Sequence, residues 1–365
     1  MEKIKSVKTK VISKEMKDGP WNPRIVWNSK TIFLVIIETD TGLVGVGEGW
    51  CDGLSPKILE TLVQESLGPL LVGKDIHMHN AIWDSVFQKS IYSAKPGLVY
   101  AALSAMDIAL WDIRGKALQL PVYKLLGGHS DKVYVYASGG LYGKNKGLSE
   151  LADEMISYVN QGFTAVKIKS GGATVSQDIA RVAVVREAVG PDIRIMVDAL
   201  YVLSVADAIK FSRGIEPYDI YFLEAPVSPN DIPGLAEVRR RGPTPVAGNE
   251  FAYGRHTFRE IMEQRAVDVA HLDCIVCGGL SEAVRIAAIT SAWNIPCSFH
   301  SSSSAVCFTA NLHAGAAVAN CDSVEYHMIH QLLFDTLPPE LTTLENGWLR
   351  LPDLPGLGLS YDQHL

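Results

Sequence analysis

The second half of the chain alternates short apolar runs with longer segments whose apolar residues recur every three or four positions. The longer segments predict helices, and the short runs between them predict strands. Strands that alternate with helices indicate a parallel sheet, and eight of them between residues 133 and 326 indicate closure into a barrel. The helices are expected at 148–160, 175–189, 205–212, 235–241, 256–264 and 282–293.

The first part of the chain has a different pattern. A long apolar run at 31–39 is followed by the turn Asp40-Thr41-Gly42 and by a returning run. Residues from about 3 to 50 therefore predict a meander of strands. Helical spacing follows from about 55 to 126 and is clearest at 101–116. The N-terminal region is thus an addition to the barrel rather than part of it.

Seven of the expected barrel strands end in, or are followed by, a polar residue. These positions are 23 to 29 residues apart, which is the room that a strand, a helix and two loops need. Because a parallel barrel places the C-terminal ends of its strands on one face, we expect these side chains to converge there. Chance explains one such position well but seven in a row poorly. The residues are Lys169, Asp198, Glu224, Glu250, Asp273, His300 and Glu325.

Two lysines share the first of these strands. Lys167 and Lys169 are two residues apart, so their side chains point to the same face of the strand. Repulsion between the two ammonium groups is expected to lower the pKa of at least one of them toward neutrality, as a general base needs. A lone pair of this kind more often marks a solvated edge strand, but the polar residues on the following strands favour the catalytic interpretation.

The irregular segment 17–28 combines Pro and Gly with two tryptophans and an arginine. Trp21, Arg24 and Trp27 could close over a substrate as a lid or could cap the hydrophobic core, and both interpretations stay open. As a lid, this apolar loop with one cation would fit a hydrophobic or aromatic carboxylate better than a sugar acid. Ser301 opens a run of four serines that could hold a substrate carboxylate or could cap a helix.

Composition excludes some classes of partner. The chain has 365 residues and a net charge of −7, without a basic patch, so we expect no nucleic-acid partner. No apolar run is long enough to span a bilayer, and the N-terminus lacks the apolar core of a signal peptide. Together with cysteines that we expect to be reduced, this indicates a cytoplasmic protein without a membrane partner.

The combination of motifs resembles the enolase superfamily and, within it, the mandelate racemase subgroup, which includes muconate lactonizing enzyme. The resemblance covers nearly the whole chain and rests on 45–48, 104–112, 167–169, 355–358 and the polar residues at the strand ends. It implies a (β/α)7β modified TIM barrel at 131–334. It also implies an α+β capping domain at 1–130, completed by about 335–365 from the C-terminus.

The same resemblance implies a Mg²⁺ site with Asp198, Glu224 and Glu250 as ligands. Hard carboxylate oxygens suit Mg²⁺, and the cation would relieve the repulsion between them. The metal would stabilise the enediolate that forms when a carboxylate substrate loses its α-proton.

The resemblance also implies roles for the other residues at the strand ends. Lys169 would be the base on one face of the substrate, with its pKa depressed by Lys167, and His300 would serve the opposite face. Asp273 would accept a hydrogen bond from His300, and Glu325 would donate one to the substrate carboxylate if protonated.

Bases on both faces permit dehydration of an acid sugar or racemisation and epimerisation, with cycloisomerisation of a lactone as an alternative. The expected partner is a small-molecule carboxylate, and a homo-oligomer, either a dimer or an octamer, is expected.

Two other classes are open on the sequence. A hydrolytic metal barrel would need histidines at strand ends, and the motif His77-Met78-His79 is instead expected at the solvated start of a helix. A non-catalytic metal-binding barrel would keep the fold without the reaction, but seven retained polar groups argue against it.

Overall fold

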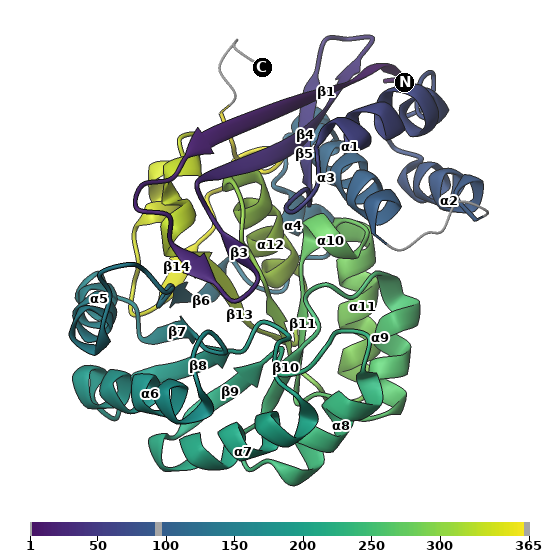
Figure 1. Ribbon diagram of the computed structural model, residues 1–365. Helices are drawn as coiled ribbons and strands as arrows, with labels where there is room; N and C mark the ends of the chain where they lie inside the picture. The colour runs from purple at the N-terminus through teal and green to yellow at the C-terminus, as the bar shows by residue number, and fades with distance from the viewer. Residues whose placement is uncertain (1, 92–96, 361–365) are drawn as a thin grey trace.

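The computed structural model describes residues 2–91 and 97–360, which form a barrel covered at one end by a sheet and helices (Figure 1). Residue 1 and residues 92–96 and 361–365 of the predicted domains lie outside the described residues. In the described part of the chain, no helix combines the length and the apolar composition that crossing a bilayer requires.

The barrel is a closed ring of eight parallel strands in the described chain, in sequence order, with the last strand paired to the first. This confirms the predicted parallel barrel and its closure. The strands are β6 (Lys132–Ser138), β7 (Ala165–Lys169), β8 (Arg194–Asp198), β9 (Ile220–Glu224), β10 (Val246–Gly248), β11 (Val269–Leu272), β12 (Cys297–Phe299) and β13 (Cys321–His327).

A helix follows each strand of the ring except the last, which gives the (β/α)7β order. The predicted helices at 148–160 and 175–189 are found at those positions, and the other predicted helices lie within about three residues of their expected bounds. The helices are α5 (Leu148–Asn160), α6 (Val175–Val189), α7 (Val205–Ile215) with η3 (Glu216–Tyr218), α8 (Ile232–Arg241), α9 (Gly254–Glu263), α10 (Cys274–Cys277), α11 (Leu280–Ala292) and α12 (Ala305–Ala317).

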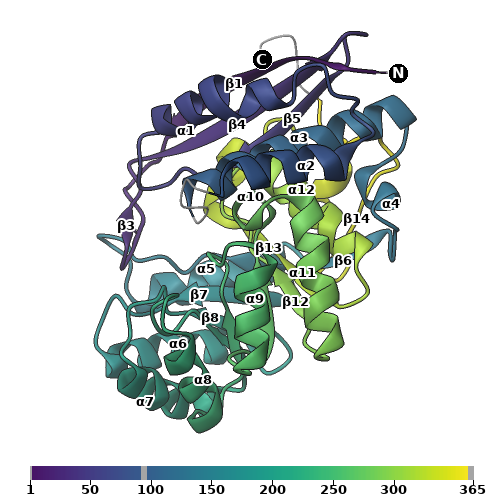
Figure 2. The same ribbon diagram turned by 90° about the vertical axis from the view of Figure 1, so that its right-hand side faces the viewer.

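The cap is an antiparallel sheet with helices packed on it (Figure 2). Glycines at 45, 47 and 49 let the sheet approach the longest helix, because a Cβ atom at Gly47 would lie 2.0 Å from the carbonyl oxygen of Ala105. The strands are β1 (Ile4–Glu15), β4 (Ser29–Thr39) and β5 (Val44–Gly49); the helices are α1 (Lys57–Thr61), η1 (Leu62–Leu67), η2 (Gly68–Leu70), α2 (His79–Lys89), α3 (Leu98–Leu118) and α4 (Val122–Leu125).

The expectation that His77-Met78-His79 lies at a solvated helix start is only half right. His77 is exposed, but His79 is buried, and its Nε2 atom lies 2.7 Å from Asp107 Oδ1 on α3. The first turn of α2 packs against α3, which brings the His79 ring within 4.6 Å of the Trp111 ring. His79 therefore links two cap helices and lies away from the strand ends of the barrel.

The C-terminal segment joins both parts of the molecule. Its strand β14 (Trp348–Arg350) pairs antiparallel with β6 of the barrel. Farther on, Leu357 N donates to Asp112 Oδ1 on α3, and Gly356 O accepts from Val122 N on α4. The stretch predicted to pack back on the N-terminal region does so. It is preceded by η4 (Met328–Leu333) and η5 (Pro339–Thr342).

A small hairpin of β2 (Trp21–Asn22) and β3 (Ile25–Val26) extends from the cap to the barrel, as both views show (Figures 1 and 2). Its attachment is a pair of backbone hydrogen bonds between Trp21 and Tyr142, 3.0 and 2.9 Å long, in the loop after β6. The hairpin thus covers part of the barrel end at which the strands terminate.

Candidate active site

The seven polar residues predicted at the strand ends are all buried at one end of the barrel. Lys169, Asp198 and Glu224 are the last residues of β7, β8 and β9 and are paired in register across the three strands. Glu250, Asp273 and His300 lie just beyond β10, β11 and β12, and Glu325 lies in β13. With Lys167, we call these residues the charged floor.

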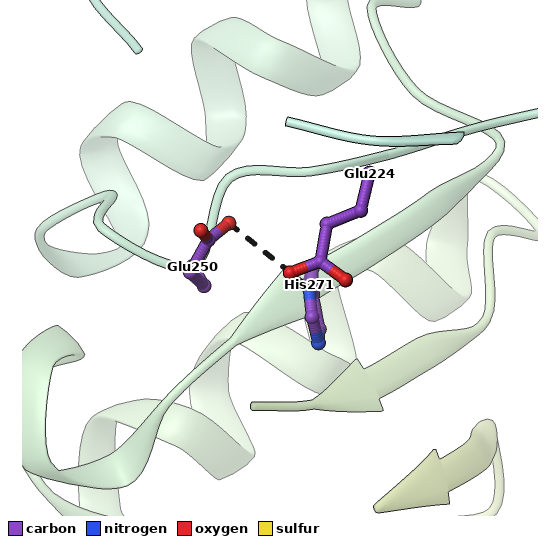
Figure 3. A group of neighbouring side chains, drawn as sticks. All are labelled: Glu224, Glu250 and His271. Atoms are coloured by element: carbon purple, nitrogen blue, oxygen red, sulfur yellow. Dashed lines mark ion pairs between the residues drawn. The ribbon is translucent and has the colours of Figure 1, made fainter. Parts of the chain in front are cut away.

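Two carboxylates of the charged floor converge with a histidine (Figure 3). Glu224 Oε1, Glu250 Oε2 and His271 Nδ1 all lie within 4.8 Å of one another. All three atoms are buried, and His271 Nδ1 lies 3.1 Å from Glu224 Oε1 and 4.0 Å from Glu250 Oε2. Two buried carboxylates this close together repel each other, so the group fits a bound cation, and carboxylate oxygens are the donors that Mg²⁺ prefers.

The electrostatics of the cluster agree with that fit. Burial, followed by the neighbouring Glu224 carboxylate, raises the pKa of Glu250 to about 7. Burial alone would also raise the pKa of Glu224, but His271 and Lys167 together hold it well below its usual range. A divalent cation would offset the repulsion that the raised pKa of Glu250 reflects.

The third predicted metal ligand has protein partners of its own. Asp198 Oδ2 accepts from Lys169 Nζ at 2.8 Å, and Asp198 Oδ1 accepts from Leu200 N at 2.9 Å. Asp198 therefore lies beside the Glu224 and Glu250 cluster while its carboxylate bonds the predicted base.

Of the two lysines, Lys167 is not one whose pKa is lowered. Its Nζ atom lies 2.7 Å from Glu224 Oε2 and 3.0 Å from Glu325 Oε1. Burial lowers the pKa of Lys167, but the two carboxylates more than offset burial and raise it well above its usual range. Lys167 is therefore a fixed cation between two carboxylates.

His300 and Asp273 form a hydrogen-bonded pair across from Lys169. His300 Nδ1 donates to Asp273 Oδ2 at 2.8 Å, and Asp273 Oδ1 accepts from Asn311 Nδ2 at 2.9 Å. Burial lowers the pKa of His300, but Glu325 and Asp273 raise it to about 9. Because Nδ1 donates to Asp273, the Nε2 atom carries a proton only when the ring is doubly protonated, and the raised pKa of His300 favours that state.

Glu325 lies between the two predicted bases. Its Oε1 atom is 4.0 Å from Lys169 Nζ, and its Oε2 atom is 3.8 Å from His300 Nε2. Burial would raise the pKa of Glu325, but Lys167 and His300 hold it well below its usual range. The expected protonated hydrogen-bond donor is thus an ionised acceptor in this structure.

A cavity of about 230 Å³ opens above the charged floor. Four residues of the charged floor line it: Lys169, Asp198, Glu250 and His300. The other lining residues come from the cap, from loops of the barrel and from the end of β13: Asn22, Arg24, Ile25, Trp27, Trp50, Asp52, Gly53, Leu200, Tyr201, Phe251, Ser302 and His327.

The predicted substrate contacts on the hairpin have distinct positions. Trp27 lines the cavity, whereas the Trp21 ring stacks on Tyr142 with 4.5 Å between ring centroids. Arg24 lines the cavity as well, but its Nε and Nη2 atoms donate to the carbonyl oxygens of Leu200 and Tyr201 after β8. Arg24 therefore fastens the hairpin to the barrel.

The serines at 301–304 have different roles. Ser301 N donates to Glu325 Oε2 at 3.3 Å, so this residue holds the floor carboxylate. Ser304 is the N-cap of α12, since its hydroxyl accepts from Val306 N at 3.1 Å. Ser302 between them lines the cavity.

Sequence reasoning missed two histidines of the site. His271 is two residues before Asp273, and His327 is two residues after Glu325. Each histidine side chain therefore points to the same side of its strand as a residue that the sequence did predict. The period of two along a strand could have found both. Trp50 and Phe251 were also missed; they come from loops, and their rings lie 6.1 and 6.0 Å from the His300 ring.

Comparison with known families matches both parts of the chain. Residues 8–127 match the model described as the mandelate racemase/muconate lactonizing enzyme N-terminal domain. Residues 150–365 match the model described as the enolase C-terminal domain-like family.

Individual relatives are similar over nearly their whole length. An arabinonate dehydratase of Saccharolobus solfataricus is 37% identical over 88% of this chain and 86% of its own. A D-galactarolactone cycloisomerase of Agrobacterium fabrum is 32% identical over 99% and 97%. The crystal structure of a racemase from Streptomyces coelicolor with bound magnesium superposes with a TM-score of 0.90, at 27% identity, over 98% and 97% of the two chains.

Proposed function

Because the chain belongs to the mandelate racemase/muconate lactonizing enzyme family of the enolase superfamily, we propose that it is a Mg²⁺-dependent dehydratase of an acid sugar. The observation that carries this proposal is the position of Glu325. Lys169 and His300 approach its two oxygens, at 4.0 and 3.8 Å, so the two groups address one small volume from opposite sides.

Two steps follow from that arrangement. Lys169, in its unprotonated form, removes the α-proton at C2 of the acid, and its Nζ atom gains that proton. The C3–O bond then breaks, and His300 Nε2 gives a proton to the departing hydroxyl, which leaves as water. The enol that remains becomes a 2-keto-3-deoxy acid. His300 Nδ1 donates to Asp273, and the raised pKa of His300 keeps its ring doubly protonated, so that the imidazolium carries its second proton on Nε2.

The metal ligands proposed are Asp198, Glu224 and Glu250. The convergence of the buried Glu224 and Glu250 carboxylates supports this set, as does the magnesium bound to the Streptomyces coelicolor racemase. A cation bound there supplies positive charge beside the substrate carboxylate, where negative charge develops as the α-proton leaves. The predicted homo-oligomer and cytoplasmic location stay predictions.

A panel of three aldonates tests the proposal. Arabinonate, D-xylonate and D-galactonate, the acids of three relatives' names, are incubated with the protein and Mg²⁺, and 2-keto-3-deoxy acid formation is followed by NMR. We expect turnover of at least one acid, its loss on addition of EDTA and its return with Mg²⁺. Absence of a keto acid from all three would contradict dehydration of this class of substrate.

A second candidate is cycloisomerisation of a lactone, which the similarity to the D-galactarolactone cycloisomerase favours. The same floor could perform it, since this reaction also begins with removal of the α-proton. The product distinguishes the dehydratase from the cycloisomerase. D-galactarolactone would isomerise without release of water, whereas an aldonate would lose water.

A further inference from the structure

The cavity has a second side that the proposed reaction does not use. His327 is the last residue of β13 and follows Glu325 by two positions, so its side chain faces the same way about 6.6 Å nearer the barrel opening. Its neighbour in register on β6 is Ser138. His327 lines the cavity together with Trp27 from the cap.

A third residue, His330 on η4, packs behind these two. The His327 and His330 rings are stacked, with 4.2 Å between centroids, and Trp27 meets the His330 ring edge-on at 6.1 Å. All three side chains are buried, at 5% exposure or less. We call Trp27, His327 and His330 the neutral wall.

The neutral wall gathers polar atoms that lack partners in the described chain. They are Trp27 Nε1, His327 Nδ1 and both ring nitrogens of His330. Ser138 Oγ, beside His327, also lacks a hydrogen-bond partner. A buried donor or acceptor without a partner costs about 1–3 kcal/mol, so few occur in a folded protein. Of these residues, Trp27 and His327 line the cavity, so a ligand there lies beside an imidazole whose hydrogen bonds the protein leaves incomplete.

The charge state of the two histidines indicates which kind of ligand group the neutral wall can bind. Burial, and then the nearby Lys169 and Lys167, hold the pKa of His327 well below its usual range. Burial, and then His327 and Lys30, do the same for His330. A neutral imidazole has one donor and one acceptor nitrogen, which matches a hydroxyl group, whereas a second carboxylate would call for a cation.

We propose that His327 is a specificity-determining residue that hydrogen-bonds a hydroxyl group of the substrate beyond C3, with His330 as its positioning residue. The proposal deepens the proposed function and rests on it, because it takes the substrate to be an acid sugar whose C2 and C3 lie over the charged floor. It also revises the expectation from the loop at 17–28 that a hydrophobic or aromatic acid would fit best.

The test removes a substrate hydroxyl and the His327 imidazole, first separately and then together. kcat/KM is measured for whichever of arabinonate, D-xylonate and D-galactonate the wild type dehydrates best. It is measured again for analogues with hydrogen in place of each hydroxyl beyond C3. We expect one analogue to lose about ten- to hundredfold with the wild type. In His327→Leu the same substitution of the substrate should change kcat/KM by no more than about twofold.

Two further variants separate recognition from general damage. His327→Gln keeps a donor and an acceptor and should restore part of the discrimination. Ile25→Ala, at an apolar lining residue, should lower kcat/KM for the acid and its analogue by the same factor. His330→Leu should weaken the discrimination without abolishing it, and thermal unfolding of each variant shows that it is folded.

Calorimetric binding of the same acids in the presence of Mg²⁺ distinguishes the two proposals. Wild-type discrimination that persists in His327→Leu would overturn the role of His327 and leave the dehydratase standing. Hydroxyl-dependent binding that is lost in His327→Leu, without any dehydration, would support the wall and overturn the proposed reaction. Neither binding nor turnover of the three acids would overturn both.

Discussion

The charged floor and the neutral wall lie beside the same cavity but differ in charge and in how far ion pairs hold their side chains. On the floor, Lys167 is paired with Glu224 and Glu325, and His300 is paired with Asp273. On the wall, the ring nitrogens of His330 and the indole nitrogen of Trp27 have no partner in the described chain. The difference teaches that ion pairs between strands hold the floor, whereas the part of the wall that lines the cavity, Trp27 and His327, is where we expect the substrate to form a hydrogen bond.

The comparison predicts that variants of the charged floor lose turnover, whereas variants of the neutral wall lose discrimination between substrates. The largest effect is expected for Lys169→Ala and His300→Asn. Each should lower turnover by about 10³-fold or more, because each removes a group that transfers a proton. NMR of product formation measures the loss, with the exposed Lys57→Ala as a control that keeps activity. Full activity in either floor variant would refute the mechanism.

The next effect concerns the metal carboxylates. Glu250→Gln should weaken Mg²⁺ binding by about a hundredfold, because it replaces an anionic oxygen donor with a neutral one. Isothermal titration of the metal-free protein measures the affinity, and unchanged affinity would exclude Glu250 as a ligand.

Although Glu250→Gln should weaken Mg²⁺ binding, it should stabilise the metal-free protein. The raised pKa of Glu250 means that the folded protein holds a proton more tightly than the unfolded chain, so the group destabilises the metal-free fold as pH rises from 4.5 toward 7. Metal-free Glu250→Gln should therefore unfold at a higher temperature than metal-free wild type at pH 8. At pH 4 the two should differ little.

A smaller effect is expected where the wall meets the substrate. Trp27→Ala should lower kcat/KM by about tenfold, mainly through KM, because it removes a buried ring from the cavity without touching the floor. Trp21→Phe is the matched control, since the Trp21 ring stacks on Tyr142 instead. Unchanged kcat/KM in Trp27→Ala would show that this loop does not set specificity.

The smallest effect is a change in acid stability. The folded pKa of His330 lies below its unfolded value of about 6.5, so its contribution to stability is present above pH 6.5 and is lost as pH falls below it. His330→Leu should reduce the loss of unfolding free energy between pH 6.5 and 5 by about 1.4 kcal/mol per pH unit. Denaturant unfolding measures this slope, and the exposed His77→Gln should leave it unchanged.

Local periodicity predicted most of the barrel, because its strands and most of its helices bury one side against a neighbour. The helix α12 escaped this reasoning for a physical reason. Nearly all of its residues from Ala305 to Ala316 are buried, so its sequence has no polar side to reveal the helical period. His79 escaped for a related reason, since its burial depends on Asp107 and Trp111 in another helix.

At the site, the positions of the strand-end residues were predictable, but their pKa values were not. The strand-end rule placed Lys169, Asp273 and His300 on one end of the barrel from their spacing alone. The pKa of Lys167 could not be derived that way, because Glu224 and Glu325 reach it from strands 57 and more than 150 residues later. A pKa in a buried cluster depends on which tertiary partners arrive, and the sequence of one strand does not contain them.

The central claim is that Lys169 removes the α-proton and His300 protonates the leaving group. Exchange of the α-proton in D₂O, followed by NMR on an acid that the wild type dehydrates, tests it most directly. Lys169→Ala should show neither exchange nor product. His300→Asn should incorporate deuterium at the α-carbon while forming no keto acid, because proton removal survives and departure of the hydroxyl does not. Exchange that persists in Lys169→Ala and vanishes in His300→Asn would contradict the assignment.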